Sequence, residues 1–212
     1  MANLSKAGLG LLLALTSALC GGGVALAQAT AEDMVKMRKD FEETCATGDA
    51  EGCFGLANMT EVGAGGAQDE AQARVIYARA CDAKEPRACF NLAVMHQEGR
   101  GGTADLAKAR ELLGRTCDLG EVKGCAVVAG MQRNGEGGPP DFVKSFENYN
   151  RLCDSGDSNG CMMVGIMVFT GQGTKADPQT GWKKMTDACK AGNQMACETT
   201  KELEALMRSK AR

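Results

Sequence analysis

Hydrophobic and polar positions recur along this chain with a period of 36 residues. A methionine is followed four residues later by a glycine, then by a second glycine two residues on, and then by an aspartate. The four columns are Met59, Met95, Met131 and Met167; Gly63, Gly99, Gly135 and Gly171; Gly65, Gly101, Gly137 and Gly173; and Asp69, Asp105, Asp141 and Asp177. Repeats of this length built from helical pairs indicate a solenoid.

Within each period the pattern predicts two helices joined by a glycine loop. Leu92 and Met95 lie three residues apart, which places both side chains on one face of a first helix, expected over residues 89–98. The Gly-x-Gly motif should end that helix, because glycine adopts left-handed backbone angles without steric cost. The aspartate that follows should cap a second helix, and Asp177-Pro178 places proline at its first position.

The ends of the repeat array predict caps. Residues 32–44 resemble a lone second helix, and residues 195–207 resemble a final first helix with a charged outer face. We therefore expect an all-α fold of about ten helices, an α/α superhelical solenoid. Its predicted parts are an N-terminal capping helix over 28–44, repeats over 45–197 and a C-terminal capping helix over 198–212.

Ten of the eleven cysteines follow the same period. They form five pairs separated by eight residues: Cys45 and Cys53, Cys81 and Cys89, Cys117 and Cys125, Cys153 and Cys161, and Cys189 and Cys197. Each pair joins the end of one predicted hairpin to the start of the next, where a disulfide would stabilise the fold by about 2–3 kcal/mol. Zinc or an iron–sulfur cluster is the alternative, but there is no Cys-x-x-Cys and only one histidine. We expect disulfides, no metal and no cofactor.

The first 27 residues predict a secretory signal. Lys6 precedes an apolar stretch, and Ala25-Leu26-Ala27 provides small residues before a cleavage site at Gln28. A membrane span is disfavoured because the apolar run is short and is interrupted by three glycines. Lipoprotein processing at Cys20 is the alternative, although Leu19 is not the usual small neighbour. Cleavage after Ala27 leaves 185 residues and an even ten cysteines, and predicts a secreted or periplasmic protein.

Charge narrows the choice of partner. The net charge is −3, or −4 once Lys6 is removed, and no run of lysine and arginine stands out. Nucleic acid and anionic membrane surfaces are therefore poor candidate partners.

The segment Leu92-Ala93…Gly99-x-Gly101…Asp105-x-x-Lys108-Ala109…Cys117 resembles the Sel1-like repeat, a relative of the tetratricopeptide repeat. The added cysteine pairs are similar to the secreted cysteine-rich Hcp proteins, a group often labelled β-lactamases. The chain departs from this pattern where Gly66, Gly102 and Gly138 replace valine, and where Thr180-Gly181 replaces Lys-Ala. We expect these departures to loosen the glycine loops and the start of the last second helix.

A serine β-lactamase needs a serine nucleophile in a Ser-x-x-Lys motif, and the sequence does not contain this motif. None of Ser145, Ser155, Ser158 or Ser209 has a lysine three residues later, and no Lys-Thr-Gly occurs. His96 is the only histidine, too few for a zinc β-lactamase; a partly exposed position on a helix is its expected role. The methionine column is expected to pack in the core and the aspartate column to cap helices, rather than to bind copper or calcium.

The favoured function is therefore a secreted or periplasmic scaffold that binds a protein or peptide. The resemblance implies that the first helices line a concave face. The residues expected to set specificity there are Asn58, Glu61, Asn91, Gln97 and Arg133. The alternatives are a penicillin-binding protein or β-lactam hydrolase, and a mitochondrial intermembrane-space assembly factor, which the bacterial-type signal disfavours.

Overall fold

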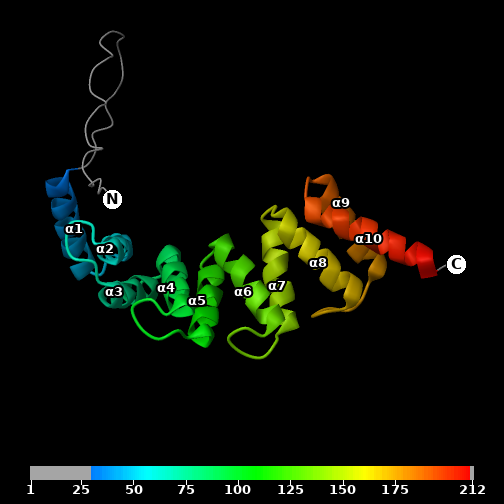
Figure 1. Ribbon diagram of the computed structural model, residues 1–212, viewed down its shortest axis with the longest axis horizontal. Helices are drawn as coiled ribbons and strands as arrows, with labels where there is room; N and C mark the ends of the chain where they lie inside the picture. The colour runs from blue at the N-terminus through cyan, green and yellow to red at the C-terminus, as the bar shows by residue number, and fades with distance from the viewer. Residues whose placement is uncertain (1–29, 211–212) are drawn as a thin grey trace, which may run out of the picture.

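The computed structural model describes residues 30–210, and within them the chain forms ten α-helices and no strand. The helices follow one another along a single arc, with the N-terminal and C-terminal helices at opposite ends (Figure 1). We call the helix that ends at each pair of cysteines a B helix and the helix that begins there an A helix, so that each glycine loop joins an A helix to the next B helix. The B helices are α1 (Ala31–Ala46), α3 (Glu70–Asp82), α5 (Leu106–Asp118), α7 (Phe142–Asp154) and α9 (Pro178–Lys190); the A helices are α2 (Ala50–Val62), α4 (Pro86–Glu98), α6 (Val122–Asn134), α8 (Ser158–Thr170) and α10 (Gln194–Lys210). The predicted all-α solenoid is confirmed.

Aspartates start the B helices as predicted. The Asp69 and Asp105 carboxylates each accept a hydrogen bond at 2.9 Å from the backbone N–H three residues on. A second set of caps was missed by the sequence analysis. Asp49 and Asp157 cap the A helices α2 and α8 in the same way, at 2.6 and 2.8 Å, and Glu85 caps α4. Because these caps precede the second cysteine of each pair, the A helices begin earlier than expected, at Pro86 rather than Cys89 in α4.

Each Gly-x-Gly motif requires glycine at its two positions for different structural reasons. Gly99 ends α4 in a left-handed conformation, with φ of 74°. Gly101 is also left-handed, with φ of 67°, and a Cβ there would collide with the backbone carbonyl of Glu70 on the preceding B helix. The second glycine therefore allows the loop to lie directly against the neighbouring repeat.

Arginine side chains fill the space left by the glycines that replace valine. A Cβ on Gly102 would lie 2.5 Å from Nη1 of Arg74, which donates to the carbonyl of Thr103 at 3.3 Å. Arg110 likewise donates to the carbonyl of Pro139 at 2.9 Å beside Gly138. The loops are therefore occupied by an arginine rather than loosened, which corrects the expectation from sequence.

The core runs along the whole arc between the A and B helices. Met95 and Met167 are fully buried, as are the alanines that line the contact between each A helix and the next B helix, such as Ala93 and Ala109. In the last pair both alanines become glycine, and a Cβ on Gly181 would lie 2.6 Å from the carbonyl oxygen of Gly165. The start of α9 therefore packs more closely on α8, and the expected loosening there is wrong.

All five predicted disulfides are present. Each joins the C-terminal end of a B helix to the first turn of the following A helix, with Cα atoms 4.3–4.6 Å apart. Cys81 and Cys89 are fully buried, whereas Cys153 and Cys161 are half-buried.

The predicted signal segment, including Cys20, lies outside the described residues. Within residues 30–210, no helix combines the length and apolar character needed to cross a membrane.

Candidate interaction surface

Tyr77 on α3 is fully buried, and its hydroxyl lies between the two A helices α2 and α4. The hydroxyl oxygen is 2.6 Å from Oδ1 of Asn58 and 2.5 Å from Oε2 of Glu61, and it accepts from Nδ2 of Asn91 at 3.2 Å. A phenol has one proton, so Asn58 and Glu61 share it. Three of the five residues predicted to bind a partner are thus brought together around one buried hydroxyl.

Glu61 also connects this group to the glycine loop of the next repeat. Its carboxylate forms an ion pair with Arg100, and Arg100 donates from Nε to Glu98 at 2.8 Å. Burial, and next the hydrogen bond to Glu61, raise the pKa of Tyr77, so that its hydroxyl stays protonated at neutral pH. We call Asn58, Glu61, Tyr77, Asn91 and Arg100 the tyrosine network.

An aromatic and a cation extend this surface along α2 and α4. The Phe54 ring lies 6.1 Å from the Tyr77 ring between centroids, and the Arg87 guanidinium lies 4.5 Å above the Phe54 centroid. Arg87 is held by Glu85, whose carboxylate accepts from its Nε at 2.6 Å. Charged, polar and aromatic groups are therefore fixed relative to one another before any partner binds.

The two other predicted residues lie outside the tyrosine network. Gln97 is exposed near the end of α4. Arg133 is half-buried on α6, and its Nη1 lies 3.9 Å from the Met163 sulfur on α8. Because both residues occupy the repeat column of Glu61, the same position is acidic, neutral and basic in three successive A helices.

The A-helix surface changes from polar to apolar along the arc. The column of Asn58 continues as Val94, Gly130 and Ile166, and the column of Asn91 continues as Val127 and Met163. Val127 is 37% exposed. A partner that followed the A helices would therefore meet polar groups first and apolar groups later.

Sequence reasoning did not identify Tyr77 as the centre of the polar group. A signal was present, because the chain has only two tyrosines and they are exactly two periods apart, at Tyr77 and Tyr149. A buried tyrosine usually needs a partner for its hydroxyl, so neighbouring polar residues could have been assigned to it.

The residues considered for catalysis are engaged in the fold. The Ser145 hydroxyl is buried and donates to the Ala129 carbonyl at 2.8 Å, and the Ser155 hydroxyl donates to the Leu152 carbonyl at 2.7 Å. His96 is half-buried, with Nδ1 2.6 Å from Nη2 of Arg74. Burial, and next the charge of Arg74, lower the pKa of His96, so its imidazole is neutral and accepts from the arginine.

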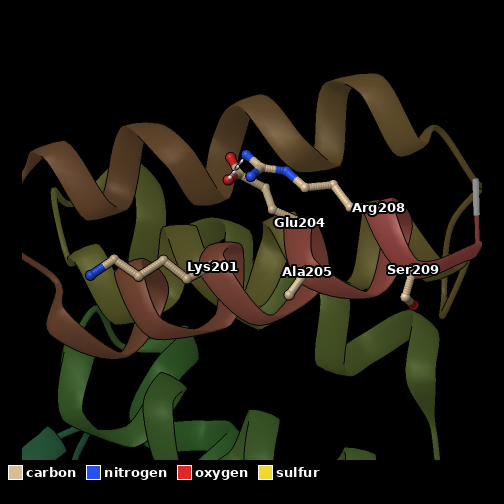
Figure 2. A pocket seen from close by; sticks show the side chains of 5 residues that line it. All are labelled: Lys201, Glu204, Ala205, Arg208 and Ser209. Atoms are coloured by element: carbon tan, nitrogen blue, oxygen red, sulfur yellow. Dashed lines mark hydrogen bonds and ion pairs between the residues drawn. The ribbon is translucent and has the colours of Figure 1, made fainter. Parts of the chain in front are cut away.

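Residues 30–210 contain sizeable hollows, and they bring together no cluster of metal-binding side chains. No group of three or more histidine, cysteine, aspartate or glutamate side chains comes together there. A hollow of about 510 Å³ lies between B helices α5 and α7, lined by mixed charges such as Arg110, Glu111 and Lys144. A second hollow, of about 530 Å³, lies along α10, where Glu204 and Arg208 point toward each other (Figure 2). The first hollow has a mainly polar lining and the second a mainly apolar one, and residues of the tyrosine network line neither.

Comparison with known proteins identifies the repeat. The family model described as Sel1 repeat matches residues 50–84, 86–121, 122–157 and 158–193. Each match begins at the start of an A helix and ends in the turn after the following B helix. No curated protein matches the sequence.

Solved structures with a similar fold include two bacterial repeat proteins. One is a protective antigen of uropathogenic Escherichia coli displaying an SLR fold, with TM-score 0.66 and 22% identity over 76% of this chain and 35% of that one. The other is a Sel1 repeat protein from Oxalobacter formigenes, with TM-score 0.57 and 18% identity over 77% of this chain and 65% of that one. The chain thus spans about a third of the first protein and slightly less than two thirds of the second.

A cysteine-rich protein is also similar. Helicobacter pylori cysteine rich protein B gives TM-score 0.49 and 20% identity, over 68% of this chain and 99% of that one.

Proposed function

Because the chain belongs to the Sel1 repeat family, whose helical arrays generally serve as protein-interaction scaffolds, we propose that it is an exported scaffold that binds a protein or peptide along its A helices. The binding surface is the exposed side of α2, α4, α6 and α8, on the concave face of the superhelix. Its specificity residues are Asn58, Glu61, Asn91, Gln97 and Arg133.

The tyrosine network is the observation that carries this proposal. Its members come from α2, α3, α4 and the loop after α4, and they hold one another in fixed positions at the surface of the A helices. Side chains that are ordered in advance lose less conformational entropy when a partner binds. Such an arrangement suits recognition of polar groups, and the apolar positions further along suit burial of a partner's hydrophobic side chains.

Five disulfides support the exported location. Disulfides form and persist in oxidising compartments and are rare in reducing ones. The test is N-terminal sequencing of the protein isolated from the periplasm or medium of its own cells. The proposal predicts a start at Gln28, and a cytoplasmic protein that retains Met1 would contradict it.

Binding is tested by comparing variants of the two surfaces. We would capture envelope proteins with the oxidised chain and with Gln97→Glu and Arg133→Glu, which change exposed or half-buried positions on A helices. The matched controls are Glu111→Lys and Lys144→Glu on B helices. The proposal predicts a partner that is lost with the A-helix variants and retained with the controls. A partner lost only with the B-helix variants would move the binding surface to the other side of the array.

A further inference from the structure

Tyr149 occupies the same place in the third matched repeat, 122–157, that Tyr77 occupies in the first, 50–84. It lies on α7 between the A helices α6 and α8, as Tyr77 lies on α3 between α2 and α4. Its side chain is buried, with 8% of the residue exposed. Two tyrosine hydroxyls, those of Tyr77 and Tyr149, therefore lie at equivalent positions along the A helices.

The surroundings of the two hydroxyls differ. Around Tyr77, Asn58 and Glu61 come from the preceding A helix and Asn91 comes from the following one. Around Tyr149, those three columns hold Gly130, Arg133 and Met163. The groups that occupy the first site are thus replaced by a residue without a side chain, by a cation and by a thioether.

The Tyr149 hydroxyl has no hydrogen-bond partner among the described residues. No side-chain polar atom of those residues is both fully buried and without a partner, so the hydroxyl is at least partly accessible to solvent. A Cβ on Gly130 would find the Tyr149 hydroxyl at 3.8 Å and no other atom within 4 Å. The glycine therefore leaves free space directly above the hydroxyl, where Asn58 lies in the first site.

Arg133 supplies a positive charge beside this opening. It reaches from α6 to Met163 on α8, and within residues 30–210 no carboxylate forms an ion pair with it. Burial raises the pKa of Tyr149, with the charge of Arg133 opposing this effect, so the phenol remains a hydrogen-bond donor at neutral pH. The site thus presents two donors, the phenol and the guanidinium, and the weakly accepting Met163 sulfur is the partner of the guanidinium.

The surroundings of Tyr77 show which chemical group can bind a phenol and a guanidinium together. At Tyr77 the hydroxyl and a guanidinium, that of Arg100, both engage the carboxylate of Glu61. In the repeat of Tyr149 the column of Glu61 holds Arg133, so a cation is present but the carboxylate is not. The neighbouring positions are apolar, with Val127 exposed on α6 and Met163 half-buried on α8.

We propose that the Tyr149 hydroxyl and the Arg133 guanidinium bind the side-chain carboxylate of an acidic residue, flanked by apolar residues, from the protein partner. The carboxylate makes the two kinds of contact that Glu61 makes at Tyr77, one with a phenol and one with a guanidinium, and the flanking residues pack on Val127 and Met163. This inference rests on the proposed scaffold function and identifies one point of contact within it.

The test uses the oxidised protein and a blocked tripeptide, acetyl-Leu-Glu-Leu-amide, whose only carboxylate is the glutamate side chain. Binding is followed by NMR through the Arg133 Nε–H and Tyr149 ring signals. We expect saturable shifts of both, and an affinity at least about tenfold lower for the glutamine tripeptide, for Arg133→Met and for Tyr149→Phe, since each removes a charge-assisted hydrogen bond. Arg208→Met, which makes the same change at an exposed arginine on α10, is the matched control and should leave the affinity unchanged.

A blocking variant tests the geometry separately. Gly130→Asn combined with Arg133→Glu rebuilds at Tyr149 the two groups that fill the first site, and it should abolish tripeptide binding while the protein stays folded by circular dichroism. Equal binding of the glutamate and glutamine tripeptides, or no saturable shift, would overturn the proposal. Tighter binding of acetyl-Leu-Gln-Leu with a free C-terminal carboxylate would overturn the assignment to a side chain. If the tripeptide fails while an A-helix partner is still captured, only the carboxylate site is refuted.

Discussion

Replacing Tyr77 with phenylalanine removes one hydroxyl from the centre of the tyrosine network and leaves the buried ring in place. The hydroxyl is shared between an amide oxygen at 2.6 Å and a carboxylate oxygen at 2.5 Å. A buried hydrogen bond to a charged group contributes about 1.5–3 kcal/mol net. Glu61 keeps its ion pair with Arg100, so its carboxylate is not left without a partner. We therefore expect the free energy of unfolding to fall by about 1.5–3 kcal/mol.

Tyr149→Phe is the matched control for this prediction. The ring is buried to a similar extent, but its hydroxyl has no hydrogen-bond partner among the described residues. The loss should be within about 0.5 kcal/mol, as for a surface change. The assay is urea unfolding of the oxidised proteins by far-UV circular dichroism, with amide hydrogen exchange to locate any loss in α2–α4. Equal losses in the two variants, or no loss in Tyr77→Phe, would refute the tyrosine network as a stabilising unit.

Further predictions concern glycine, pH and the disulfides. Gly101→Ala should cost at least about 2 kcal/mol more in urea unfolding than Gly120→Ala, since both glycines have positive φ but only the first meets a backbone carbonyl; similar costs would exclude the close approach. The raised pKa of Tyr77 in the folded protein means that its contribution is complete below about pH 10 and is lost as pH rises further. Wild type should therefore lose more stability than Tyr77→Phe between about pH 10 and pH 12; parallel losses would contradict this. Under limiting reductant, Cys153–Cys161 should be alkylated before Cys81–Cys89, because the first is half-buried and the second fully buried; mass spectrometry showing the reverse order would exclude access as the controlling factor.

The repeat columns were enough to predict the helical pairs, the glycine loops, the aspartate caps and the disulfide pairs. Each of these features depends on residues that are identical or nearly so at a spacing of 36, such as Asp69 and Asp105. The caps of the A helices were harder to find, because that column holds aspartate in two repeats and glutamate in two, and glutamate caps by a different geometry, as at Glu85.

Contacts between different columns could not be predicted in this way. Arg74 fills the space beside Gly102 only because the glycine loop folds back onto the preceding B helix. The same limit applied to the site. Asn58 and Asn91 were expected to set specificity on the concave face, and the repeat columns did not show that both lie half-buried around the Tyr77 hydroxyl, which comes from a third helix.

The most direct test of the scaffold is site-specific photocrosslinking in living cells. A photoreactive amino acid would replace exposed Gln97 on α4, with exposed Glu111 on α5 as the matched position on a B helix. The account predicts a discrete crosslinked protein from Gln97 in the envelope fraction and none from Glu111. A crosslink only from Glu111, or the same weak smear from both positions, would contradict binding along the A helices.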